Sequence, residues 1–202
     1  MAATQPVDFG PIKEKLVAMI GAARDAFNRH SPTGLNQFKN LQTAVIKEIE
    51  AALQKLSQRL PQARGEEKNK LAAFQTVLTE LQKVAATLES LVEPIRKKVQ
   101  NNVLFSEKAV SQTNGLFDCQ AGLLRSVFDI IQTDNAYLKK FVQAEGEKSV
   151  RECADFATEH ETRLIEGLCT PQAAPIFLAI LEKFQALAKL EVELMQKLNV
   201  GS

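Results

Sequence analysis

The sequence predicts an all-α protein built from six long helices. Strong helix formers (Ala, Leu, Lys, Glu and Gln) dominate the 202 residues, with only nine Gly and seven Pro. Apolar residues recur at spacings of three and four over long stretches, which is the period of one helical face. No stretch alternates apolar and polar residues with the period of a strand.

The helices of the first half are expected over residues 8–29, 33–61 and 66–101. Ser31 and Pro32 separate the first two, because Ser favours the cap of a helix and Pro its first turn. Pro61 and Gly65 end the second helix. The third helix has the clearest heptad seam, as expected of a long antiparallel bundle helix: Leu71, Phe74, Leu78, Leu81, Ala85, Leu88, Val92, Ile95 and Val99.

The helices of the second half are expected over residues 106–132, 134–166 and 171–198. Asn114 and Gly115 indicate either a kink or a late start in the first of them. Residues 143–149 (QAEGEKS) are nearly free of apolar side chains, so we expect an irregular or solvent-facing turn there. Thr170 and Pro171 predict the start of the last helix.

Composition and charge exclude several classes of protein. The chain is 45% hydrophobic and 24% charged, which is typical of a folded domain and not of a disordered one. A net charge of +1 without runs of like sign gives no field that would select nucleic acid or an anionic membrane. No apolar run approaches 18 residues, and the start lacks a signal-peptide pattern. We therefore expect a soluble, cytoplasmic protein without direct membrane insertion.

Cysteine and histidine give no catalytic or zinc pattern. Cys119, Cys153 and Cys169 lack CxxC spacing and are expected to be small buried side chains. His30 lies at a predicted helix end, and His160 lies on an apolar face as a core residue. Cys153 and His160 are two turns apart, roughly 10 Å, which is beyond hydrogen-bond reach. The sequence predicts neither an enzyme nor a cofactor.

An internal repeat divides the chain near residue 102. Residues 1–102 and 103–202 each hold three predicted helices in the same order. A shift of 100 residues aligns 81–86 (LQKVAA) with 181–186 (LEKFQA), with three of six positions identical. The repeat predicts two similar three-helix units.

The chain resembles the PhoU-like family of phosphate transport regulators. The similarity is densest in residues 160–184, HETRLIEGLCTPQAAPIFLAILEKF. Residues 80–99, ELQKVAATLESLVEPIRKKV, resemble the equivalent first-half helix. The resemblance implies two tandem three-helix bundles that form one domain. It rests on these positions: His160, Arg163, Gly167, Leu181, Glu182 and Lys183, with the basic end Arg96, Lys97 and Lys98.

The metal-binding motif of that family is degenerate in this chain. The family places Glu and Asp four apart on one helical face, and two such helices supply oxygen ligands to metal ions. The matching positions here are Gln82 and Ala86 in the first half, and Glu182 and Ala186 in the second. One carboxylate of four remains, so we expect no metal cluster.

Three other acids remain as candidates for a site. Glu89 and Glu93 lie four apart on the third predicted helix, either as a residual cation site or as an exposed pair. Glu191 falls on the apolar stripe of the last helix. It lies either at the edge of that stripe or in the core, facing an Arg or Lys of another helix.

The resemblance implies a non-catalytic regulator or adaptor that tunes phosphate transport or phosphate-responsive signalling through protein contacts. Its partner would be a phosphate transporter or a sensor kinase, which would bring the protein to the inner face of the membrane. The alternative is a general helical scaffold or oligomerisation module unrelated to phosphate. A homodimer is compatible with either function, and the sequence does not identify partner-binding residues.

Overall fold

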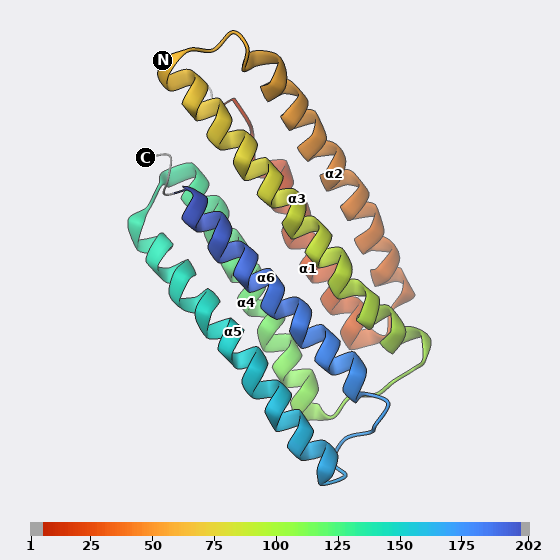
Figure 1. Cartoon of the computed structure of the whole chain (residues 1–202). Helices are drawn as coiled ribbons and strands as arrows, with labels where there is room; N and C mark the ends of the chain where they lie inside the picture. The colour runs from red at the N-terminus through yellow and green to blue at the C-terminus, as the bar shows by residue number, and fades with distance from the viewer. Residues whose placement is uncertain (1–5, 199–202) are drawn as a thin grey trace.

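The computed structural model describes residues 6–198, and this part of the chain contains helices and no strand (Figure 1). The all-α class predicted from the sequence is confirmed, and the helix boundaries agree to within a few residues. The helices are α1 (Gly10–Arg29), α2 (Pro32–Arg59), α3 (Gly65–Gln100), α4 (Glu107–Thr133), α5 (Ala136–Ile165) and α6 (Ala174–Leu198).

Local side-chain bonds fix several helix ends. The hydroxyl of Ser31 accepts a hydrogen bond from the Gly34 N–H at 3.0 Å, which caps α2. Ser106 caps α4 in the same way. The predicted start of the last helix at Pro171 is too early. Ala173 N–H donates to the Thr170 carbonyl in a turn, and α6 begins only after it.

A late start of α4 and an irregular turn in α5 are wrong, because both helices are continuous. α4 runs through 114–115 without a late start. Within 143–149 of α5, Gly146 and Ser149 are buried. A Cβ added to Gly146 would lie 2.4 Å from Val192 Cγ2 of α6. The small residues on the buried side of this turn therefore permit α5 and α6 to approach closely, whereas Ala144, Glu147 and Lys148 face solvent.

The first three helices of the described chain meet the last three along two seams. In each half, every helix contacts the other two, and the halves meet where α1 contacts α4 and where α3 contacts α6. Figure 1 shows α2 and α5 on the outer sides of this arrangement. α1 and α4 run antiparallel, because Lys13 near the start of α1 binds Asp129 near the end of α4 at 2.6 Å.

A chain of phenylalanine rings joins the halves at one end of the bundle. Phe105, in the linker between α3 and α4, has ring centroids 5.5 Å from Phe27 of α1 and 5.8 Å from Phe177 of α6. Phe27 lies 6.1 Å from Phe117 of α4, which lies 4.9 Å from Phe184 of α6. These distances and the mostly edge-on angles are favourable for aromatic pairs. Phe105 of the linker is therefore packed against the core.

The close packing of α1 on α2 predicts an effect of Gly34. A Cβ added there would lie 2.9 Å from the Ala26 backbone nitrogen, whereas a Cβ on Gly115 would meet no atom within 4 Å. Gly34→Ala should lower the free energy of unfolding by about 1–3 kcal/mol. Gly115→Ala should raise it by about 0.5–1 kcal/mol, because Ala favours a helix. Urea unfolding measures both, and equal stabilities of the two variants would contradict this packing.

Candidate functional site

A groove of about 870 Å³ lies between the C-terminal part of α3 and the N-terminal part of α6. Its floor is largely apolar and its walls carry polar and charged side chains. The lining residues are Ser90, Glu93, Pro94, Lys97, Asn101 and Val103 on one side, and Gln172, Pro175, Ile176, Ala179, Glu182 and Lys183 on the other.

Helix periodicity explains why these residues share one face. On α3 the lining residues from Ser90 to Asn101 recur at spacings of three and four, and so do those from Pro175 to Lys183 on α6. From Ser90 to Asn101 the α3 wall is about 16 Å or three turns long, and from Pro175 to Lys183 the α6 wall is about 12 Å long. The groove is therefore a short trough with one helix along each side.

The groove is open because no third helix of the described chain crosses it. α2 contacts both α1 and α3, and α5 contacts both α4 and α6, so the groove of each of these pairs carries a third helix. Within residues 6–198, no helix contacts both α3 and α6. The described part of the chain therefore places no helix in the third position on this pair.

The two seams between the halves differ in how they are closed. Three polar pairs bridge the α1/α4 seam along its length: Lys13–Asp129, Arg24–Asp118 and Asn28–Asn114. In the described residues, the α3/α6 seam has one such bridge, from Lys197 to Glu80 at the end remote from the groove. This bridge also shows that α3 and α6 run antiparallel. The α3/α6 seam is thus joined by an ion pair at one end and open at the other.

The Glu80 bridge is stable to moderate acid. Burial by itself would raise the pKa of Glu80, but hydrogen bonds from Lys197 and Lys83 outweigh it and lower the pKa below its ordinary value. Glu80 therefore stays ionised at neutral pH and keeps its bridge to α6.

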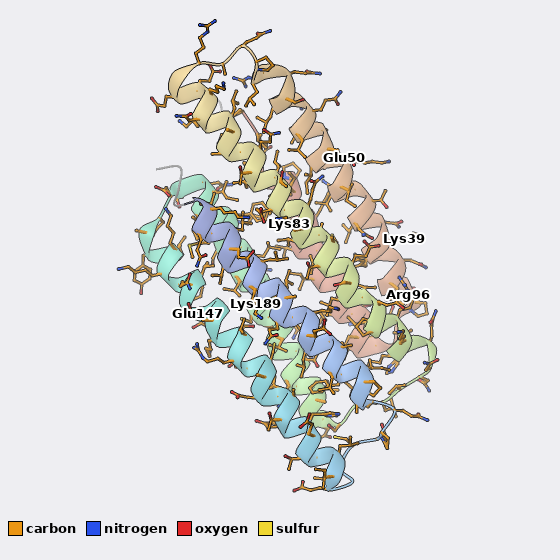
Figure 2. All side chains as sticks on the ribbon, viewed as in Figure 1. Lys39, Glu50, Lys83, Arg96, Glu147 and Lys189 are labelled. Atoms are coloured by element: carbon orange, nitrogen blue, oxygen red, sulfur yellow. The ribbon has the colours of Figure 1, made fainter. Side chains whose placement is uncertain are left out.

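Two of the acids singled out in the sequence line the same groove from opposite walls. Glu93 of α3 accepts a hydrogen bond from Arg96 at 2.7 Å, and Glu182 of α6 accepts one from Lys183 at 2.9 Å. Figure 2 labels Arg96 toward the C-terminal end of α3. Each carboxylate is thus paired with a base on its own helix.

The other positions of the degenerate motif lie outside the groove. Gln82 and Ala186 are half-buried, and Ala86 and Glu89 are exposed. Residues 6–198 contain no group of three or more His, Cys, Asp or Glu side chains arranged to hold a metal ion. The absence of a metal cluster stays a prediction from the sequence.

Glu191 is fully buried, with 0% of its surface exposed. Neither carboxyl oxygen has a hydrogen-bond partner among the described residues. Glu191 is therefore in the core and not at the edge of the stripe, but it forms no ion pair with a described Arg or Lys. Burial raises its pKa well above the ordinary value, so the neutral carboxyl is favoured.

Lys98 is buried, whereas the sequence pattern identified it only as part of a basic helix end. Its Nζ donates to the Phe27 carbonyl at 2.9 Å, lies 2.9 Å from His30 Nε2, and sits over the rings of Phe27 and Phe105. Burial lowers its pKa to about 8. Its position seven residues after the buried Leu91 was the available signal for burial.

The predicted core histidine and cysteines have the following environments. His160 is buried 4.8 Å from the Phe177 ring, and neither ring nitrogen has a partner in the described chain. Burial, reinforced by Arg163, lowers the His160 pKa and favours neutral imidazole. Burial raises the pKa of Cys153 to about 12, so this thiol stays protonated. Cys119 and Cys169 are half-buried and free.

A second groove of about 550 Å³ lies between α4 and α5. The charges at its rim are already paired. Lys148 lies 3.6 Å from Glu145 and 3.8 Å from Glu152, and Asp118 binds Arg24 of α1. This groove offers less unsatisfied polarity to a ligand than the α3/α6 groove does.

No known protein family, curated protein or solved structure matches this chain. Across residues 6–198, none of the helices has the length and apolar character that crossing a bilayer requires. The family resemblance therefore rests on the residues quoted in the sequence analysis.

The buried Glu191 predicts a specific pH dependence of stability. Its folded-state pKa is raised above the ordinary 4.5, so the unfolded chain loses this proton first as the pH rises. The stability of the wild type relative to Glu191→Gln should therefore fall as the pH rises from about 4.5 toward neutral, by up to about 1.4 kcal/mol per pH unit. Urea unfolding of both proteins across this range measures the difference. A difference independent of pH would contradict the burial of this acid.

Proposed function

We propose that the protein is a non-catalytic regulator or adaptor that binds a helix of a partner protein in the α3/α6 groove. The observation that carries this proposal is the uncovered seam of α3 and α6 over an apolar floor. The pairs α1/α3 and α4/α6 already carry α2 and α5, and polar pairs bridge the α1/α4 seam. A partner helix would complete the same arrangement on α3/α6.

The dimensions of the groove suit a helix of about three turns. An amphipathic helix binds such a trough through apolar side chains at i, i+3 or i+4, and i+7. Pro94, Ile176 and Ala179 of the floor would receive these side chains. Burying one large apolar side chain contributes about 1.5–3 kcal/mol, so a few such contacts support a regulated, reversible complex.

An exposed apolar end of the bundle extends this binding surface. Leu104 is 70% exposed, and Ile165 and Leu168 are 87% and 63% exposed. Leu104 follows Val103 of the groove wall, and the two connections lie together because Cys169 Sγ is 3.9 Å from Ser106 Oγ. Exposed apolar patches of this kind mark interaction sites. A partner that continues past the groove would cover this end.

We further propose that the partner belongs to phosphate uptake or the phosphate response, as a phosphate transporter or a sensor kinase. The support is that residues 80–99 and 160–184, which carry the PhoU-like resemblance, contribute most of the two walls of the groove. The protein would then act in the cytoplasm, at the inner face of the membrane through its partner. The exposed Leu104, Ile165 and Leu168 also favour a second candidate, an oligomerisation module unrelated to phosphate.

The rate of phosphate uptake by the source cell tests whether the groove is needed for the proposed function. Deletion of the gene should change the uptake rate of labelled phosphate, and the wild-type gene should restore it. Ala179→Arg, which places a charge on the apolar floor, should fail to restore it. Ala86→Arg, at an exposed position of α3 outside the groove, is the matched control and should restore it.

Thermal unfolding must first show that both variants fold as the wild type does. Restoration of uptake by Ala179→Arg would contradict docking in the groove. An unchanged uptake rate after deletion would contradict the link to phosphate and leave the oligomerisation module as the better proposal.

Metal analysis tests the expected loss of the metal cluster. After incubation of the untagged protein with iron, zinc or manganese and removal of free ions, elemental analysis should find well below one ion per chain, because Gln82, Ala86 and Ala186 supply no carboxylate. One or more bound ions per chain would contradict the expected loss of metal binding. Glu89, Glu93 and Glu191 would then be the candidate ligands.

A further inference from the structure

We infer that the helix bound in the α3/α6 groove presents an acidic side chain to Lys97. This inference rests on the proposed docking function and adds the chemistry of the partner. It follows from the charges that line the groove and from how each of them is paired.

Lys97 is the charged residue of the groove that has no ion-pair partner among the described residues. Among the four charged lining residues, Glu93 is bound by Arg96 and Glu182 by Lys183. The side chain of Lys97 forms no ion pair or hydrogen bond with any residue of the described range 6–198. A carboxylate brought into the groove would therefore meet a free ammonium group at Lys97.

The neighbouring Lys98 reinforces the positive charge at this end. Its Nζ is bound by the Phe27 carbonyl and the His30 ring, and no described carboxylate forms an ion pair with it. Neither Lys97 nor Lys98 thus has an acidic partner in the described chain. Lys97 lines the groove, and Lys98 is buried behind it. Lys97 is therefore the lining charge that is available to an anionic group of the partner.

The position of Lys97 in the groove indicates where the acidic residue lies along the partner helix. Lys97 lies one turn before Asn101, toward the end of the groove where Val103 and Gln172 line it. A helix that covers the apolar floor would exclude water beside Lys97, which strengthens a charge-assisted hydrogen bond. The acidic residue should therefore flank the apolar face of the partner helix, near the end that points to Leu104 and Leu168.

Selection from a displayed peptide library tests this chemistry while the natural partner is still unidentified. The full-length protein is the bait, and the probe is a library of helix-forming peptides of about 16 residues, long enough for the three-turn trough. Peptides that also bind Ala179→Arg are discarded, because that variant blocks the floor. The retained peptides should carry Glu or Asp at one fixed position beside their apolar face.

Charge reversal then gives the quantitative readout. Lys97→Glu should weaken binding of the selected peptides by about tenfold or more, and selection on Lys97→Glu should enrich Lys or Arg at the same position. Lys39→Glu makes the same change of charge at an exposed position of α2, a helix that does not contact α6 (Figure 2). Binding to this control should stay within about twofold of wild type.

The outcomes separate the two proposals. Peptides that require the open floor but lack a fixed acid, and bind Lys97→Glu as well as wild type, would overturn the inference and leave docking intact. Failure to enrich any peptide that distinguishes wild type from Ala179→Arg would overturn both. Thermal unfolding of each variant confirms that a loss of binding is not a loss of fold.

Discussion

The burial of phenylalanine rings across the two halves is the contact on which the arrangement of this bundle depends. Phe105 contacts Phe27 and Phe177, so the linker between α3 and α4 is held against α1 and α6. Lys98 binds the same cluster through the Phe27 carbonyl and the two rings. This cluster fixes α3 and α4 where the chain passes from one half to the other, and with them the two seams.

The functional proposal follows from the difference between those seams. Polar pairs such as Arg24–Asp118 close the α1/α4 seam along its length. Between α3 and α6, the Lys197–Glu80 bridge fixes one end and leaves an apolar trough at the other. A trough between antiparallel helices can receive a third helix without rearrangement of the bundle, so binding need not be accompanied by unfolding.

The two halves repeat in helix order but differ in core chemistry. α2 buries the large apolar side chains of Phe38, Val45, Ile49 and Leu56, whereas α5 buries mainly small and polar ones. Most of the buried polar residues accordingly lie in α4, α5 and α6: Gln112, Thr113, Gln120, Ser149, His160 and Glu191. Buried polar groups without partners are costly, so we expect the second half to be the less stable one.

The sequence by itself determined the helices, because helical periodicity and caps such as Ser31 and Ser106 are local properties. It also singled out Glu93 and Glu182, but only tertiary structure decided that they line one groove, because that requires the antiparallel meeting of α3 and α6. The same limit applies to burial. Lys97 and Lys98 are adjacent and chemically identical in the sequence, yet one faces the groove and the other the aromatic core. Local pattern determines which residues share a helical face, and the packing of distant helices decides what that face meets.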